Sequence, residues 1–423
     1  MATIRQIWAR EIIDSRGTPT LESACQLDTG HVVVSSIPSG ASTGTHEALE
    51  LRDKENPRFK GKGVQKAVDN VNKVLGPALV GMDPAQQFDI DNKLIQMDGT
   101  ENKGNLGANA ILAVSEVVTK AGAVAAGKSL FLWVSELAKT VGLTVNLKMP
   151  VPLFNMINGG LHGAGNLDFQ EFLVIPASSK TFKEGFTSAV EIYMTVGENL
   201  ARRGAIHSVG DEGGFAPNLF TNADALEVFV ESIKQTNYSL GRDVFLGLDV
   251  AANSFFKDNA YQIKDAQQPL SEDQLIEYYK NLNNQYRLAI LEDPLAEDSW
   301  GGWKKLTQAL GSQVSIVGDD LVVTNLKRLE RAIKEGAANA VLVKPNQIGT
   351  VSETIQVVKM ARDAGWRVVA SHRSGETNDS FIADFAVGVG ADYAKFGAPA
   401  RGERVAKYNR LSNIEIEISR LQQ

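Results

Sequence analysis

The sequence predicts an α/β protein in which residues 141–423 form a modified (β/α)8 TIM-type barrel and residues 1–140 form a separate α+β domain. Two observations predict the barrel. Short apolar segments that end in charged side chains recur between residues 244 and 399, and amphipathic helical patterns separate them. A third observation predicts the other domain, because residues 1–140 show strand patterns followed by helical patterns.

The apolar segments of the barrel region have the form of strands buried on both faces, which a parallel sheet covered by helices requires. Helical patterns at 325–338 and 351–365 would supply that cover. A closed barrel brings the C-terminal ends of consecutive strands around one point. The side chains that should converge there are Asp249, Glu292, Asp319, Lys344, His372, Arg373, Ser374 and Lys395.

The beginning of the barrel is less regular. Residues 149–176 hold two strand-like segments close together, and a long helical pattern follows at 181–203 before the next strand. Eight uniform strand-helix units therefore cannot be assigned from periodicity.

The first 37 residues predict three antiparallel strands, and the last two are joined by a tight turn. The segment 38–48 is small and flexible, and it forms either a mobile cover over a site or a surface connection. Four helical patterns follow at 63–76, 83–96, 105–127 and 129–140, and Asp83 should cap the second of them. We expect the domain to end near residue 140 and residues 141–152 to link it to the barrel.

Composition indicates which binding partners and which cellular compartment to expect. The chain of 423 residues has a net charge of −7 and a pI near 5.5, which argues against direct nucleic-acid binding. The single cysteine, Cys25, alternates in phase with Leu21 and Leu27, so we expect a core position and no disulfide. The most apolar region is interrupted by Glu116 and Lys120, and the N-terminus lacks an apolar signal segment. We expect a cytoplasmic protein without a membrane span.

Carboxylates and lysines at the predicted strand ends suggest the chemistry. Asp249, Glu292 and Asp319 offer hard oxygen ligands, which favour Mg²⁺. The alternative is that each acid caps a helix or pairs with a lysine. Lys344 and Lys395 would repel each other, and a nearby divalent cation would disfavour a second positive charge further, so one of them can be neutral and act as a base. The alternative is two solvated lysines in salt bridges.

Other polar residues would complete such a site. Arg373 and Ser374 combine a planar guanidinium with a hydroxyl, which suits a phosphate. The glycine-rich turn 211–214 carries two adjacent acids, Asp211 and Glu212, and could supply a general acid. His162 could contact substrate or be a hydrogen-bonded loop histidine. These groups suit one reaction class. A lysine abstracts a proton next to a carboxylate, Mg²⁺ stabilises the enediolate, and an acid helps a leaving group depart.

The sequence resembles the enolase family from residue 3 to residue 412. The matching motifs, in order, are REIIDSRG, PSGASTG, DGTENKGNLGANAIL, QEF, GDEGG, LEDP, GDDLVVTN, KPNQIGT, SHRSGET and GERVAKYNRL. Lysine and magnesium acting together are the established pattern of the enolase superfamily. The resemblance implies an N-terminal α+β domain, an irregular start to the barrel, and reversible dehydration of 2-phospho-D-glycerate to phosphoenolpyruvate.

The resemblance also implies roles for individual residues. Lys344 resembles the base that takes the C2 proton, Glu212 the acid that assists loss of the C3 hydroxyl, and Glu171 the partner of that acid. Two Mg²⁺ ions per active site are implied, one conformational and one catalytic. The implied metal ligands are Asp249, Glu292, Asp319 and, in the mobile loop, Ser42, and the implied substrate contacts are His162, Gln170, Arg373, Ser374 and Lys395. A homo-oligomer is implied, with dimer and octamer both open.

Few positions depart from the family pattern. Phe396 stands where a threonine is usual, and its ring could shift the neighbouring ammonium of Lys395. Thr18 replaces the usual asparagine, and the stretch after His162 is unusual. Two other functions stay open: a different lyase or isomerase of the superfamily, and a non-catalytic structural or surface-binding relative. A second role at the cell surface, with protein partners, also stays open.

Overall fold

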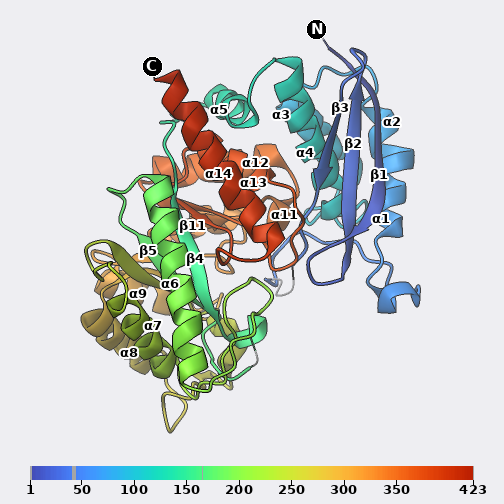
Figure 1. The fold of residues 1–423 in the computed structure, drawn as a ribbon. Coiled ribbons are helices and arrows are strands. Elements are labelled where there is room, and N and C mark those ends of the chain that lie inside the picture. The colour runs from blue at the N-terminus through green and yellow to red at the C-terminus, as the bar shows by residue number, and fades with distance from the viewer. Residues whose placement is uncertain (1, 41–43, 164, 423) are drawn as a thin grey trace.

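The computed structural model describes residues 2–40, 44–163 and 165–422, and it has the predicted two-part architecture (Figure 1). The N-terminal part holds an antiparallel sheet of β1 (Ile4–Ile13), β2 (Pro19–Leu27) and β3 (Val32–Ser36), in that order. The predicted meander is therefore confirmed.

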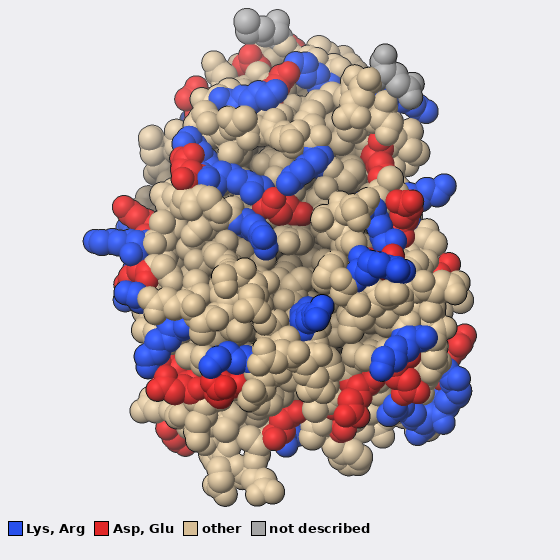
Figure 2. All heavy atoms as spheres, turned by 90° about the vertical axis from the view of Figure 1, so that its left-hand side faces the viewer, with Lys and Arg blue, Asp and Glu red and all other residues tan. Residues whose placement is uncertain are grey.

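On the barrel side, Figure 2 shows basic and acidic side chains interspersed over one face of the molecule.

The N-terminal sheet is followed by η1 (Arg58–Gly61), α1 (Gln65–Asn70), η2 (Val71–Leu75), α2 (Gly76–Ala78), α3 (Gln87–Asp98), α4 (Ala108–Ala125) and α5 (Leu130–Thr140). Of these, α4 packs against β2 and β3, and α1, η2 and α2 pack against β1. Cys25 is fully buried in the apolar cluster beneath α4, as predicted. The predicted cap of the second helical pattern is wrong. Asp83 accepts a hydrogen bond from the backbone N–H of Ala85 (2.9 Å) and closes a turn, so α3 begins only at Gln87.

The helix α4 has the length and composition of a membrane-crossing segment. Of its apolar window, however, 83% is buried inside the protein, and buried core helices meet the same criterion. It is therefore weak evidence for a membrane span.

The C-terminal part is a closed eight-stranded barrel. Its strands are β4 (Val151–Asn158), β5 (Glu171–Pro176), β6 (Val244–Asp249), β9 (Leu288–Glu292), β10 (Ser315–Gly318), β11 (Ala340–Val343), β12 (Arg367–Ser371) and β13 (Tyr393–Lys395). The strands from β6 onward are mutually parallel, and β13 closes the barrel by pairing parallel to β4. Apolar side chains fill the interior, among them Leu173, Ile290, Val317, Leu342 and Val369.

One strand, β5, explains why regular units could not be assigned at the start of the barrel. It runs antiparallel to both neighbours, β4 and β6. Glu171, its first residue, therefore lies opposite Asp249, the last residue of β6. A reversed strand carries its N-terminal residue to the barrel end at which the parallel strands finish.

Helices surround the barrel, with α14 running across it (Figure 1). They are α6 (Phe182–Arg202), α7 (Asn222–Lys234), α8 (Glu272–Tyr286), α9 (Trp300–Leu310), α10 (Leu326–Glu335), α11 (Pro345–Ile348), α12 (Val351–Asp363), α13 (Phe381–Gly388) and α14 (Gly402–Leu421). Short elements complete the fold: η3 (Gly160–His162), η4 (Ala252–Phe255), β7 (Phe256–Lys257) and β8 (Ala260–Tyr261). The buried side chains of α5 share the apolar cluster of the barrel helices, and the predicted domain boundary at residue 140 stays a prediction.

The unusual Phe396 fills space between the barrel and α14. Its ring is fully buried, 5.8 Å from the ring of Tyr408, which in turn lies 4.7 Å from Phe154 on β4. The preceding side chain, Lys395, reaches Asp249 across the barrel mouth, because successive residues of an extended strand point to opposite sides. Phe396 thus contributes to packing, and its ring belongs to the outer core.

We expect Phe396→Thr to destabilise the protein by about 3–5 kcal/mol, the range for large core truncations. The change leaves a cavity against Tyr408 but leaves the ion pairs of Lys395 in place. Urea unfolding followed by circular dichroism measures the loss, and activity per folded molecule should stay within about twofold. Lost activity at unchanged stability would contradict this packing role.

A buried acid lies where the two parts of the chain meet. Glu116 of α4 is 4% exposed and accepts a hydrogen bond from the Ser35 hydroxyl (2.9 Å). Close by, Lys120 of the same helix pairs with Asp379 of the barrel (2.6 Å). Burial, followed by the negative charge of Asp379, raises the pKa of Glu116 to about 8.

This pKa makes stability depend on pH with a definite sign. Between the unfolded value of 4.5 and the folded value of about 8, the folded protein binds the proton of Glu116 and the unfolded chain does not. Stability should therefore fall as pH rises through this window and level off above it, by on the order of 4 kcal/mol. We expect Glu116→Gln to reduce the slope by this share in urea melts at pH 5 and pH 8.5, and the remaining slope comes from other buried acids with raised pKa values, such as Glu292 and Asp320. Glu330→Gln, on the exposed face of α10, is the control, and an unchanged slope in Glu116→Gln would refute the assignment.

Candidate active site

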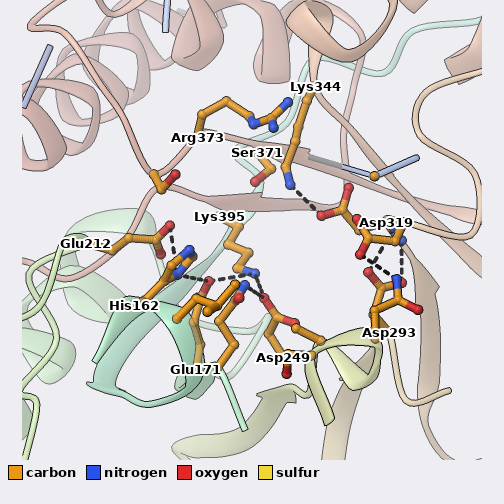
Figure 3. Close-up of a pocket in the computed structure, with 18 of the residues that line it drawn as sticks. His162, Glu171, Glu212, Asp249, Asp293, Asp319, Lys344, Ser371, Arg373 and Lys395 are labelled. Atoms are coloured by element: carbon orange, nitrogen blue, oxygen red, sulfur yellow. Dashed lines mark hydrogen bonds and ion pairs between the residues drawn. The ribbon is translucent and has the colours of Figure 1, made fainter. Parts of the chain in front are cut away.

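The strand ends of the barrel surround a cavity of about 300 Å³ (Figure 3). Gly44 and Thr45, from the segment that precedes the N-terminal helices, also border it. The predicted site residues that line it are His162, Gln170, Glu171, Glu212, Asp249, Asp319, Lys344, Arg373, Ser374 and Lys395. Glu292 is 1% exposed and touches the site only through Lys395. Ser42 lies outside the described residues, as do residues 41 and 43 of the predicted mobile loop.

Lys344 enters the cavity directly after β11. Its backbone N–H donates to the Thr324 hydroxyl (2.9 Å), and Pro345 begins the short helix α11, so the backbone on both sides of the lysine is fixed. Its ammonium forms an ion pair with Asp319. Gln347 of α11 donates a further hydrogen bond to Asp319 (2.8 Å). The lysine and the acid that the sequence placed on neighbouring strands therefore meet.

Lys395 lies deeper, among four carboxylate oxygens. Its ammonium contacts Asp249 Oδ2 (2.8 Å), both oxygens of Glu292 (2.9 Å each) and Glu171 Oε1 (3.1 Å). Gln170 donates to Asp249 (3.1 Å) and so holds that carboxylate in place. In this arrangement the three predicted magnesium ligands pair with lysines, which is the alternative that the sequence left open.

These contacts determine the protonation of the two lysines. Burial alone would lower the pKa of Lys344, but the charge of Asp319 outweighs it and the pKa is raised. The pKa of Lys395 is raised well above its usual range, because Asp249, Glu171 and Glu292 outweigh burial. Both shifts favour protonated lysines in this arrangement. The expectation of one neutral lysine beside a bound divalent cation stays a prediction.

The acids outnumber the cations on the side of the cavity formed by β6, β9 and β10. Burial, then the charge of Asp249, raises the pKa of Glu292 to about 8. Burial and the neighbouring Asp319 likewise raise the pKa of Asp320 to about 7. The pKa of Asp293 is raised well above its usual range by burial and by the same two aspartates, Asp319 and Asp320. Such an excess of buried negative charge requires compensation.

A divalent cation fits this donor set. One group whose ligand atoms all lie within 4.8 Å of one another is Asp293, Asp319 and Asp320, and carboxylate oxygens are the ligands that Mg²⁺ prefers. Asp293 also accepts hydrogen bonds from the backbone N–H groups of Asp319 (2.9 Å) and Asp320 (2.8 Å), which orients both residues. Sequence reasoning missed Asp293 and Asp320, although each directly follows a predicted ligand. Their position next to Glu292 and Asp319 was the available signal.

Glu212 and Glu171 form the acidic group on the other side of the cavity, with His162 between them. His162 Nδ1 lies 3.4 Å from Glu212 and 3.9 Å from Glu171. Asn155 of β4 donates to Glu212 Oε2 (3.3 Å), and His372 Nε2 lies 3.3 Å from the same oxygen. Glu212 thus has polar neighbours on three sides, and the hydrogen bond from Asn155 orients its carboxylate.

The two glutamates titrate in opposite directions. Burial, followed by the charge of Glu212, raises the pKa of Glu171 well above its usual range. Burial acts on Glu212 in the same direction, but His372, His162 and Arg404 outweigh it and lower the pKa of Glu212 well below its usual range. In this arrangement the opposite shifts favour a proton on Glu171 over one on Glu212.

Arg373 faces the cavity from the loop after β12. Its guanidinium contacts both oxygens of Glu47 (2.9 and 3.3 Å) and donates to Asn346 (3.1 Å). Glu47 follows directly on the segment 44–46, and it also accepts from the Gly44 N–H (2.9 Å). The end of the predicted mobile loop therefore reaches the site through an acid that sequence reasoning missed. PSGASTGTHEA contains this glutamate, but its charge gave no reason to expect a contact with Arg373.

Comparison with family models agrees with this architecture. Residues 4–134 match the model of the enolase N-terminal domain, and residues 146–423 match the model of the enolase C-terminal TIM barrel domain. Enolase-type enzymes are lyases and are typically magnesium-dependent, which agrees with the buried carboxylate groups that could hold a metal. Because the two matches together span nearly the whole chain in the order of the fold, the chain belongs to the enolase family.

Proposed function

We propose that this protein is a glycolytic enolase, which interconverts 2-phospho-D-glycerate and phosphoenolpyruvate. The observation that carries the proposal is the placement of a lysine and a carboxyl pair on different sides of one cavity. Figure 3 shows Lys344 entering beside Asp319, while Glu212 and Glu171 approach with His162 from the other side. Elimination across two adjacent carbons needs a base on one side and an acid on the other.

The reaction follows from these positions. Lys344 takes the C2 proton of 2-phosphoglycerate, and the electrons of that C–H bond become available to the adjacent carboxylate. Their return forms the C2–C3 double bond as the C3–O bond breaks, and the hydroxyl leaves as water with a proton from Glu212. Because the pKa directions favour the proton on Glu171, that proton must pass to Glu212 before Glu212 can donate it to the leaving hydroxyl. Lys395 balances charge beside the substrate carboxylate, and Arg373 with Ser374 contacts the phosphate.

Lys344 must lose its proton before it can act as a base. Its raised pKa comes from the ion pair with Asp319, so separation of the two side chains would lower that pKa. The lysine then becomes a base within a site where burial already disfavours its charged form.

The family resemblance assigns Asp249, Glu292 and Asp319 as the residues that would hold magnesium. Asp319 also belongs, with Asp293 and Asp320, to the group whose ligand atoms lie within 4.8 Å of one another. When bound, Mg²⁺ supplies positive charge that stabilises the doubly negative enediolate. Two ions per site, with Ser42 as a ligand of the second, are part of this proposal. So are a homo-oligomeric state and a cytoplasmic location.

The test is direct. Native protein is mixed with 2-phosphoglycerate and Mg²⁺, and the ultraviolet absorbance of the conjugated product is followed, with D-glycerate and 3-phosphoglycerate as comparison substrates. We expect absorbance to grow with 2-phosphoglycerate alone, to stop when a chelator removes the metal, and to resume when Mg²⁺ is restored. No growth in folded native protein with excess Mg²⁺ would overturn the proposal. Turnover of the unphosphorylated substrate instead would point to another lyase of the superfamily.

A further inference from the structure

Arg404, near the start of α14, is a buried cation that lies outside the cavity. It contacts the residues next to Glu212, the proposed acid. Its side chain has no exposed surface. Its guanidinium reaches His372 Nδ1 (2.7 Å) and the backbone carbonyls of Arg373 (2.6 Å), Ser374 (2.5 Å) and Asp211 (3.0 Å). One side chain thus joins the turn that carries Glu212 to the loop that carries Arg373 and Ser374.

The contact with His372 determines which ring nitrogen carries the proton. An arginine guanidinium has donors and no acceptor, so Nδ1 of His372 must accept. In a neutral imidazole the proton then resides on Nε2. The ring is neutral, because burial lowers the pKa of His372 to about 3 and the charge of Arg404 acts in the same direction.

The Nε2 side of the ring lies next to the proposed acid, close enough for electrostatic attraction but without the geometry of a hydrogen bond. Nε2 lies 3.3 Å from Glu212 Oε2, the same oxygen that accepts from Asn155. With the other tautomer, an unprotonated Nε2 would face that oxygen and the two lone pairs would repel. Arg404 therefore decides whether His372 attracts or repels one oxygen of Glu212.

The packing around this chain of contacts leaves no room for adjustment. Gly397 has φ +85°, and a Cβ there would lie 2.7 Å from the carbonyl oxygen of Glu212 and 3.0 Å from both Arg404 Cδ and His372 Cε1. The backbone N–H of Ala398 also donates to the Glu212 carbonyl (2.9 Å). Both ends of Glu212, its carbonyl and its carboxylate, are thus fixed against residues that touch Arg404.

We propose that Arg404 is a positioning residue of the acid group: it holds His372 as the Nε2–H tautomer and thereby orients the carboxylate of Glu212. This inference rests on the proposed function for its effect on turnover, but the tautomer itself does not. Arg404 acts through His372 and the Asp211 carbonyl and has no position in the cavity wall.

The first test needs no substrate. Histidine labelled with ¹⁵N reports the protonation of each ring nitrogen by its chemical shift, and the chain has five histidines, His31, His46, His162, His207 and His372. His372→Gln assigns the signal of His372. We expect an unprotonated Nδ1 and a protonated Nε2 at pH 7. A protonated Nδ1, in either tautomer or imidazolium form, would overturn the proposal.

Two variants then separate positioning from packing. Arg404→Lys retains a group that can only donate, so the Nε2–H tautomer should persist. Arg404→Gln can present either a donor or an acceptor, so the second tautomer should appear, and kcat should fall about 10–100-fold with KM within about threefold. Equal loss of kcat in both variants, with one unchanged tautomer, would mean that Arg404 is merely structural and would overturn the proposal.

Lys407 supplies the matched control, one turn further along α14. It is also buried, but its partners are Glu376 and the backbone carbonyls of Thr377 and Glu403. We expect Lys407→Gln to lower stability and to leave the tautomer of His372 unchanged. If the native protein fails to dehydrate 2-phosphoglycerate but has the expected tautomer, the proposed function fails while the positioning geometry stands. Full activity with the opposite tautomer of His372 would overturn the positioning role of Arg404 and leave the proposed function standing.

Discussion

Replacing Lys344 by alanine should lower kcat for 2-phosphoglycerate by about 10²–10⁴-fold, the usual contribution of a positioned general base. Lys344 enters the cavity directly after β11, with Asp319 at the end of one neighbouring strand and the Arg373 loop after the other. Among the described residues that line the cavity, it is the basic side chain at this position. Removal of the ammonium leaves nothing there to accept the C2 proton. Initial rates from product absorbance, with circular dichroism to verify folding, measure the effect.

Two control variants sharpen this prediction. Lys344→Arg retains the positive charge beside Asp319, but a guanidinium cannot be deprotonated near neutral pH, so this variant should be as inactive as alanine. Lys327→Ala removes an exposed lysine whose partner is Glu101 on the surface, and it should retain full activity. Activity of Lys344→Arg close to the native value would show that Lys344 provides charge only and is not the base.

Glu212→Gln should also lower dehydration by about 10²–10⁴-fold, because an amide cannot donate the proton that the C3 hydroxyl needs to leave. The substitution preserves size and can still accept from Asn155, so the fold should be unaffected. Glu198→Gln, on the exposed face of α6, controls for the general effect of removing a negative charge. A loss smaller than about threefold would exclude Glu212 as the acid.

The parallel strands of the barrel could be predicted from sequence because each is buried on both faces and reads as an unbroken apolar run. Val341, Leu342 and Val343 need no partner to be recognised as a strand, and the lysine that follows marks its end. Glu171 could not be found in this way. It stands at the beginning of a reversed strand, and only the pairing with β6 places it beside Asp249.

Contacts that form only in the folded chain were the other features that the sequence could not predict. Arg404 lies in GERVAKYNRL, where its charge and helical surroundings resemble those of a solvated surface residue, yet it is fully buried. Glu47 and Arg373 are 326 residues apart and meet only in the folded chain. The ion pairs of the two lysines were also beyond sequence reasoning. Repulsion between Lys344 and Lys395 could be inferred from strand order, but the closer ion pairs to Asp319 and Asp249 could not.

Exchange of the C2 proton tests most directly whether Lys344 and Glu212 act at separate steps on opposite sides of the substrate. Each protein is incubated with 2-phosphoglycerate and Mg²⁺ in D₂O, and proton NMR follows the loss of the C2 signal in the remaining substrate. Glu212→Gln should still exchange this proton while its dehydration is impaired, and Lys344→Ala should do neither. Exchange that persists in folded Lys344→Ala would contradict the assignment of Lys344 as the base.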